Sequence, residues 1–227
     1  MTVCIHQPEH LPWLGLIHKI AISDTYVVLD NVQYKKNYFE NRNKIYTNQG
    51  WNWLTLPVKM KGHIEKSFFE MELIEGWKRK YVATLLQNYR KAPFFTDIEK
   101  VLNRIENYDG NSLADLNILI IKEICSILDI NTPFVRAKEM NVIGNKTELL
   151  ISILTQLDAK AYIVGKSGFD YMNLDLFKIN NIELKTHQFN HPKYIPFNFP
   201  ELTDYPCALD VIANLGKEKV KQLINYN

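Results

Sequence analysis

Hydrophobic and polar residues follow two different periods along this chain, one typical of buried strands and one typical of helices. Residues 2–6, TVCIH, form a short β-branched run that stops before a proline, which predicts a strand that enters a loop. From residue 11 to 22 apolar residues recur at helical spacing, and Pro12 suits the first turn of a helix. Residues 24–30, DTYVVLD, predict a second buried strand. This order of strand, loop, helix and strand is typical of a parallel α/β unit.

The middle of the chain is dominated by helical periodicity. The segments WKRKYVATLLQNY, FFTDIEKVLNRIEN and SLADLNILIIKEICSIL predict three helices between about residues 75 and 130, with Asn111 or Ser112 as the N-cap of the third. Ahead of them, WNWLTLPVK and SFFEMEL predict two strands, which we expect to pair as a hairpin across MKGHIEK.

The α/β rhythm resumes in the last third of the chain. Strands are predicted for PFVRAKEM, AYIVGKSG and IELKTHQF, and helices for KTELLISILTQLD, MNLDLFKINN and the C-terminal segment. We therefore predict a single domain over residues 1–227 of class α/β: a mostly parallel sheet with flanking helices and a central helical insertion at about 75–130. Segments 1–58 and 132–190 are expected to supply the strands of that sheet.

Composition narrows the class of protein. The chain has 227 residues, of which 46% are hydrophobic and 23% charged, as is ordinary for a folded domain. The formal net charge is +2, so no global field favours DNA or an anionic membrane as a partner, although local basic patches are compatible with this value. Cys4, Cys125 and Cys207 are far apart and lack metal-ligand spacing, which predicts reduced thiols and no metal site.

The N-terminus shows no signal-peptide pattern, and the longest apolar stretch is interrupted by Lys122 and Glu123. We therefore expect no membrane span and a cytoplasmic location. The oligomeric state is left open.

The loop after the first strand, HQPEHLPWLG, concentrates hydrogen-bonding groups between two prolines. His6 at the strand end is a candidate acid, base or phosphate donor, because imidazole titrates near neutral pH, and Gln7 stands beside it. The alternative interpretation is that His6 packs in the interior and His10 is exposed to solvent. Two histidines are too few for a zinc site.

A polar segment follows the second strand, and its length suggests a functional or mobile loop. It contains the planar guanidinium of arginine, the ammonium of lysine and the amides of asparagine and glutamine, which suit a nucleotide-linked or phosphorylated ligand. A loop exposed to solvent explains the same residues. Nearby lysines and aromatic residues also suggest RNA, which the net charge of +2 makes a weak interpretation. The candidate residues are Asp30, Gln33, Tyr34, Lys35, Asn41, Arg42 and Asn43.

A third candidate loop, VGKSGFDYM, follows a buried strand. Its glycines allow backbone amides to approach an anion, but the spacing of a P-loop is absent. Taken alone, this loop is a weak signal. The candidate residues are Gly165, Ser167, Gly168, Asp170 and Tyr171.

Taken together, HQPEHLPWLGLIHKI, DTYVVLDNVQYKKNYFENRNKI, WLTLPVK and YIVGKSGFDYMNLDLF resemble the WbqC-like protein family, over about residues 6–192. This family occurs in bacterial gene clusters for O-antigen and other surface polysaccharides, where it is associated with the transfer of glycine to an amino sugar. Lys166 departs from the family pattern, and His10 falls at a variable position. The positions that carry the motifs are His6, Gln7, Pro8, Leu11 to Gly15, Asp30, Gln33, Tyr34, Lys35, Asn41, Arg42, Asn43, Gly165, Gly168, Asp170 and Tyr171.

The resemblance implies a transferase that acylates the amino group of a nucleotide-linked sugar. Such a reaction needs a base for the attacking amine, a role for His6 or Asp30. It also needs cations for the sugar diphosphate, which Lys35 and Arg42 supply, and Asn41 and Asn43 would contact the sugar. The glycine must arrive activated, as a tRNA ester, a thioester on a carrier protein or an adenylate made from ATP.

Two other functions remain open. The order of strand, histidine loop and helix is similar in topology to nucleotidyl- or adenylyl-transferring enzymes of the HxGH type, although HxGH itself is absent. A non-catalytic protein that binds a nucleotide sugar would use the same residues. In each case we expect loops 6–15, 31–43 and 165–171 to line one crevice at the carboxyl ends of the strands.

Overall fold

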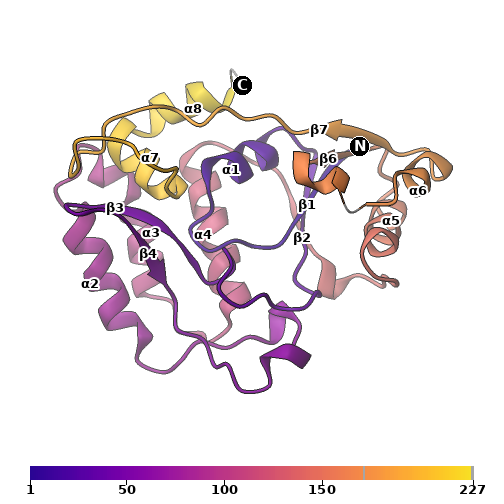
Figure 1. Cartoon of the computed structure of the whole chain (residues 1–227), viewed down its shortest axis with the longest axis horizontal. Helices are drawn as coiled ribbons and strands as arrows, with labels where there is room; N and C mark the ends of the chain where they lie inside the picture. The colour runs from indigo at the N-terminus through magenta and orange to yellow at the C-terminus, as the bar shows by residue number, and fades with distance from the viewer. Residues whose placement is uncertain (171, 226–227) are drawn as a thin grey trace.

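Within residues 1–170 and 172–225, the part of the chain that the computed structural model describes, five parallel strands form one sheet in the order β5-β2-β1-β6-β7 (Figure 1). The predicted α/β class, with its mostly parallel sheet, is therefore confirmed. The strands are β1 (Thr2–His6), β2 (Thr25–Val28), β5 (Phe134–Arg136), β6 (Ala161–Val164) and β7 (Glu183–Thr186).

Helices cover both faces of this sheet, because neighbouring residues of a strand point to opposite sides. On one side Cys4 of β1 joins a core with α1 (Leu14–Ala21). On the other side Val3 and Ile5 pack with α5 (Thr147–Gln156) and α6 (Leu174–Ile179). Strands buried on both faces explain why their sequences read as continuous apolar runs.

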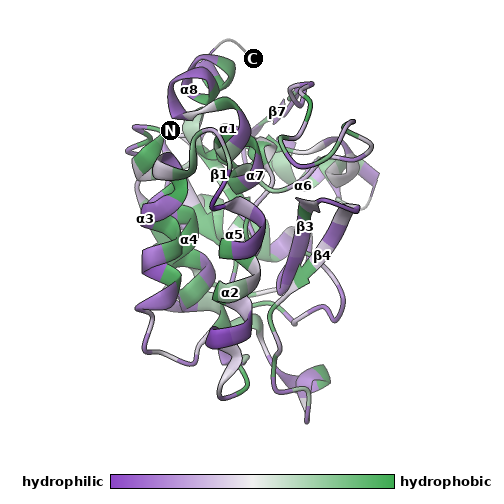
Figure 2. Ribbon diagram, turned by 90° about the vertical axis from the view of Figure 1, so that its left-hand side faces the viewer, coloured by the Kyte–Doolittle hydropathy of each residue, from purple (hydrophilic) through white to green (hydrophobic). Residues whose placement is uncertain are grey.

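A long insertion separates β2 from β5. Its helices occur where the sequence predicts them, and Ser112 is the N-cap of the third, with its hydroxyl accepting from the Asp115 amide at 3.2 Å. That third helix, α4, is hydrophobic along much of its length (Figure 2), because it packs against the other helices and the sheet. The insertion contains β3 (Arg42–Thr47), β4 (Gly50–Thr55), η1 (His63–Glu65), η2 (Phe68–Glu70), α2 (Trp77–Tyr89), α3 (Phe95–Glu106) and α4 (Leu113–Ile127).

The predicted hairpin across MKGHIEK is reduced to a single antiparallel bridge between Val58 and Leu73. β4 instead pairs antiparallel with β3, and the two form a separate sheet. The segment around Phe68 is a short helical turn, closed by a capping box between Ser67 and Glu70. β3 was missed because its polar side chains hide the alternation of a strand. Its Tyr46 is buried by a distant segment of the chain: the ring lies near Phe199, and the Thr203 amide donates to the Tyr46 hydroxyl at 2.6 Å.

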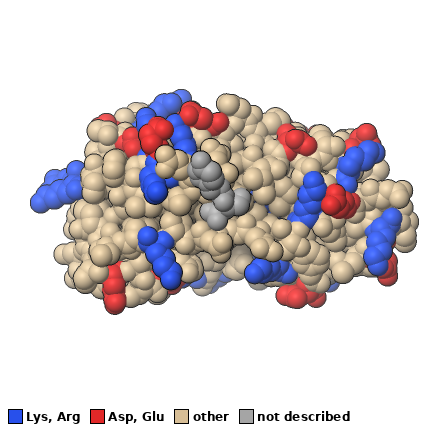
Figure 3. All heavy atoms as spheres, turned by 90° about the horizontal axis from the view of Figure 1, so that it is seen from above, with Lys and Arg blue, Asp and Glu red and all other residues tan. Residues whose placement is uncertain are grey.

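The C-terminal part of the chain returns across the hairpin formed by β3 and β4 and ends in two helices. The Cys207 amide donates to Lys44 of β3 at 3.0 Å and the Ala208 amide to Pro12 at 2.7 Å. Basic and acidic side chains are intermixed on the face seen in Figure 3, so that face carries no broad charge of one sign. No helix in the described residues is long and apolar enough to cross a membrane. The remaining elements are η3 (Ala137–Glu139), η4 (Lys166–Asp170), α7 (Ala208–Leu215) and α8 (Lys217–Asn225).

Candidate functional site

The strand order reverses between β1 and β6. From β1 the chain moves through α1 to β2 and later to β5, whereas β6 and β7 lie on the opposite side of β1. In doubly wound sheets the carboxyl ends of strands at such a reversal leave a crevice that binds ligands. A pocket of about 250 Å³ lies there, lined by Ile5, His6, Gln7, Trp13, Leu16, Lys19, Leu29, Leu150, Tyr162, Val164, Gly165, Ser167, Gly168 and His187.

His6, the last residue of β1, faces a buried carboxyl group. Its Nδ1 lies 2.9 Å from the carbonyl oxygen of Gln7, which can only accept, so Nδ1 carries the proton. Its Nε2 lies 3.8 Å from Oε1 of Glu9, whose residue is 8% exposed. The second oxygen of Glu9 has no hydrogen-bond partner among the described residues. An electron pair on Nε2 therefore faces a carboxyl group that can donate to it when protonated.

The pKa values of this pair are shifted in opposite directions. Burial lowers the pKa of His6 to about 4, and the charge of Lys19 acts in the same direction. Burial raises the pKa of Glu9 to about 8, against the opposing effects of the Trp13 backbone amide and Lys19. At neutral pH His6 is therefore an uncharged imidazole and Glu9 is mostly a protonated acid. Such perturbed pairs in a cleft are typical of functional sites.

Lys19 supplies the positive charge of the pocket. It projects from α1, is 6% exposed, and holds its ammonium 5.8 Å from the centroid of the Tyr162 ring. In the described part of the chain no carboxylate lies within ion-pair distance of it. Burial also lowers the pKa of the lining His187 to about 4, so this ring is neutral at pH 7. A buried cation without a counterion is costly, and an anionic ligand would offset that cost.

Two close approaches shape the walls of the pocket. The Trp13 indole lies across the backbone at Gly15, where an added Cβ would sit 2.2 Å from the ring. At Gly168 an added Cβ would lie 2.4 Å from Cγ2 of Val164. These contacts explain the glycine of PWLG and the second glycine of GKSG, Gly168. They leave a partly exposed indole facing a narrow glycine-bearing turn.

The loop from His6 to Gly15 is held in place by the insertion. His10, which the alternative interpretation of this loop left in solvent, is fully buried between Asn117 of α4 (Nδ1 to Oδ1, 2.9 Å) and Tyr81 of α2 (Nε2 to the hydroxyl, 2.5 Å). Asn117 also donates to the carbonyl of Pro8 at 2.8 Å. Leu11 adopts a left-handed φ of 42°, a conformation that persists only where its surroundings enforce it. The loop is therefore rigid because of distant residues as well as its prolines.

Asp30 is placed outside the pocket. Its Oδ2 accepts from Nε of Arg136 at 2.7 Å and forms an ion pair with Nη2 of the same guanidinium, also at 2.7 Å, and its Oδ1 accepts from the Lys138 amide at 3.0 Å. The residue is fully buried. Its role as a proton acceptor stays a prediction. The arrangement favours a structural role instead, since Arg136 also binds Asp115 of α4 and thereby ties the insertion to β5.

None of the candidates from the loop after β2 lines the pocket. Gln33 donates to the carbonyl of Ile64, Asn41 donates to that of Leu56, and Asn43 donates to those of His10 and Leu11. Tyr34 stacks on Phe68, Arg42 lies over Trp53, and Lys35 over Tyr38. Of these, Lys35 is close enough for its charge to contribute to the low pKa of His6. Asp170 is exposed at the end of η4, and Tyr171 lies outside the described residues.

Sequence reasoning did not find Glu9, Trp13, Lys19 or His187 as site residues. Two signals were available. Lys19 interrupts the apolar face of a helix, and His187 follows directly after β7, at the same edge of the sheet as His6. Glu9 and Trp13 gave no pattern beyond their place in the loop.

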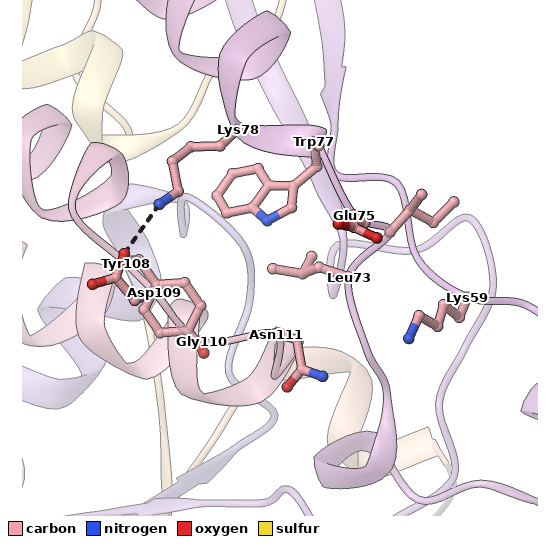
Figure 4. A pocket seen from close by; sticks show the side chains of 11 residues that line it. Lys59, Leu73, Glu75, Trp77, Lys78, Tyr108, Asp109, Gly110 and Asn111 are labelled. Carbon is pink, nitrogen blue, oxygen red and sulfur yellow. Dashed lines mark ion pairs between the residues drawn. The ribbon is translucent and has the colours of Figure 1, made fainter.

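A larger pocket, of about 410 Å³, lies between residues 73–78 and 108–111 (Figure 4). Its Lys78 is 3.7 Å from Asp109, a carboxylate that is almost fully exposed. Charges that pair with each other in solvent leave nothing for a ligand to neutralise, so the smaller pocket is the better candidate. Among the described residues, no group of three histidine, cysteine, aspartate or glutamate side chains is arranged to hold a metal ion.

Comparison with known proteins gives one consistent result. The WbqC-like protein family matches residues 7–222. The chain is also 30% identical to an uncharacterized protein of Mycobacterium tuberculosis, Rv1507c, over 95% of this chain and 94% of that protein. No solved structure matches. Apart from Ile5 and His6, all the residues that line the pocket lie within the matched region. The chain therefore belongs to the WbqC-like protein family.

Proposed function

We propose that the pocket between β1 and β6 binds a nucleotide-linked amino sugar, and that the protein transfers an aminoacyl group, glycine by family resemblance, to its amino group. The reaction would serve the synthesis of bacterial surface polysaccharide such as O-antigen. The observation that carries the proposal is Lys19, a buried cation without an ion-pair partner in the described residues, beside the His6–Glu9 pair. A sugar diphosphate supplies the missing counterion.

The side chains divide the work of acyl transfer. The amine nitrogen attacks the activated carbonyl carbon, a C–N bond forms, and the C–O or C–S bond to the donor breaks. His6 takes the proton of the amine on Nε2, and the protonated Glu9 beside it supplies the proton that the departing oxygen or sulfur needs. The developing oxyanion would accept from backbone amides of the turn from Gly165 to Ser167, since the Gly168 amide already donates to the Gly165 carbonyl at 2.8 Å.

Ligand binding also tunes the base. With a pKa of about 4, free His6 is a weak proton acceptor. Part of that shift comes from the charge of Lys19, which a bound phosphate neutralises. A bound sugar nucleotide would therefore raise the pKa of His6 by the part that is due to Lys19, while the larger part, due to burial, would remain. Trp13 offers its exposed indole face for stacking on the base or the sugar ring.

The proposal is tested by thermal unfolding with UDP-linked amino sugars, UDP and ATP, on the wild type, Lys19→Met and the exposed-lysine control Lys36→Met. A ligand at a hundred times its Kd stabilises by about 2.7 kcal/mol. That corresponds to a Tm rise of roughly 5–10 °C at this chain length. We expect this rise in the wild type and in Lys36→Met, and none in Lys19→Met.

The alternatives give different results. Stabilisation by ATP alone would support adenylyl transfer, although the buried His10 removes one of the two histidines that such chemistry would use. Stabilisation by sugar nucleotides without transfer from glycyl-tRNA, glycyl thioester or glycine with ATP would support a binding protein. No stabilisation by any of the ligands would contradict the proposal.

A further inference from the structure

The hairpin β3–β4 and the loop before it present a row of aromatic rings on the surface. The row runs through Tyr38, Phe39, Trp53 and Trp51, with successive ring centroids 5.4, 5.8 and 6.1 Å apart. Tyr38 is 50% exposed, Trp51 37% and Trp53 38%. Aromatic residues that adjoin one another at the surface mark interaction sites more often than single exposed ones do. We call these four residues the aromatic row.

Cationic side chains lie over the same rings. The Arg42 guanidinium is 4.2 Å from the centroid of Trp53, and the Lys35 ammonium is 5.4 Å from that of Tyr38. Lys44 lies between the two indoles, 4.8 Å from Trp51, and is paired with Asp204. Neither Lys35 nor Arg42 has a carboxylate within ion-pair distance in the described part of the chain. The row therefore carries net positive charge, although the chain as a whole is nearly neutral.

We propose that the aromatic row binds single-stranded RNA, with bases stacked on its rings and phosphates beside Arg42 and Lys35. Alternating aromatic and cationic side chains are the features with which proteins hold single strands. A neutral glycan would also stack on indoles, but the unpaired cations would contribute nothing to its binding. A duplex presents phosphates but keeps its bases stacked on one another, so the rings would contribute nothing to it.

One end of the row is joined to the histidine loop. The carbonyl of Phe39 accepts from the His10 amide at 2.8 Å, which joins the row to the loop that contains His6 and Trp13. Lys35 at this end is close enough to His6 to affect it electrostatically. A strand that continues beyond this end of the row, past Lys35, would extend toward the pocket. On the proposed function, on which this step alone rests, the terminus of that strand is the aminoacylated 3′ end of the acyl donor.

The test measures fluorescence anisotropy of a labelled single-stranded RNA of about ten nucleotides, a length within the span of known single-strand sites. The same sequence as single-stranded DNA, as duplex RNA, and with dextran as competitor provides the comparisons. Variants are Trp53→Ala, Trp51→Ala and Arg42→Gln. The control is Phe69→Ala, which removes an aromatic ring of similar exposure that also has a lysine over it, Lys138 at 5.7 Å.

We expect either tryptophan variant to weaken RNA binding by roughly tenfold, since stacking on one ring contributes that much. Arg42→Gln should lower the slope of log K against log salt by about 0.7, the value for one phosphate contact on a single strand. Phe69→Ala should bind as the wild type does. Tighter binding of DNA than of RNA would overturn the assignment of the row to RNA.

The proposal is also overturned if RNA does not bind, if duplex binds as well as single strand, if dextran competes, or if Phe69→Ala weakens binding equally. Quenching of tryptophan fluorescence in the wild type gives a second readout that does not depend on any variant folding. Sugar-nucleotide stabilisation without RNA binding would remove this inference and leave the proposed function intact. RNA binding without sugar-nucleotide stabilisation would contradict the proposed function and leave the RNA-binding inference intact.

Discussion

Replacing Asn117 by alanine is expected to destabilise the protein strongly, although the residue lies outside the pocket. Its amide donates to the carbonyls of Pro8 and Glu40 at 2.8 and 2.7 Å, and its oxygen pairs with Nδ1 of His10 at 2.9 Å. The substitution leaves three buried polar groups without partners, each costing about 1–3 kcal/mol, with some relief from water in the vacated space. We expect a loss of about 4 kcal/mol, or roughly 12 °C in Tm.

Urea unfolding followed by circular dichroism measures this change. The matched control is Asn107→Ala, because Asn107 makes one exposed hydrogen bond to the carbonyl of Asn103 at 2.8 Å and should cost less than about 0.5 kcal/mol. Sugar-nucleotide binding should weaken in Asn117→Ala only, since its loop loses its support. A loss below 1 kcal/mol for Asn117→Ala would refute the view that the insertion holds the loop.

Three further predictions follow from buried charges. Lys19→Met should raise the free energy of unfolding of the ligand-free protein by about 1 kcal/mol, because an unpaired cation is replaced by a thioether of similar length, and any loss would count against an anion site. Asp30→Asn should cost roughly 3 kcal/mol in urea unfolding, because it removes the buried one of the two carboxylates that neutralise Arg136. An inactive but fully stable variant would instead support Asp30 as the base. The pKa of Glu9 is about 8 in the folded protein and has its ordinary value of 4.5 in the unfolded chain, so the folded protein binds the proton more tightly. The free energy of unfolding should therefore fall by about 2 kcal/mol between pH 6.5 and 8. Glu9→Gln should abolish most of that fall.

The fold could be predicted from the sequence for the strands that are buried on both faces of the sheet. Residues of β1, β2 and β6 form short apolar runs at the spacing of α/β units, and these runs identified the central strands correctly. β3 was not predictable in the same way, because Arg42 and Lys44 interrupt its pattern and the residues that bury Tyr46 come from more than 150 positions away. Local sequence does not encode such a contact.

The site was predictable to the level of strand ends. His6, Gln7 and the glycines after β6 lie in the pocket because parallel strands bring their carboxyl ends to one edge. The polar residues after β2 looked equally suited to a ligand, but Asn43 holds the histidine loop instead, and Arg42 faces outward over Trp53. Residue type alone does not distinguish an amide that binds a ligand from one that fixes a backbone.

The central position of β1 has a consequence for synthesis on the ribosome. β1 pairs with β2 soon after both are made, but its other edge waits for β6, roughly 150 residues later. At ordinary rates of translation the nascent chain carries this unpaired hydrophobic edge for about 10–30 s. Open edges of this kind recruit other strands. Yield in a cell should therefore depend on chaperones that cover the emerging chain more than the stability of the finished protein would suggest.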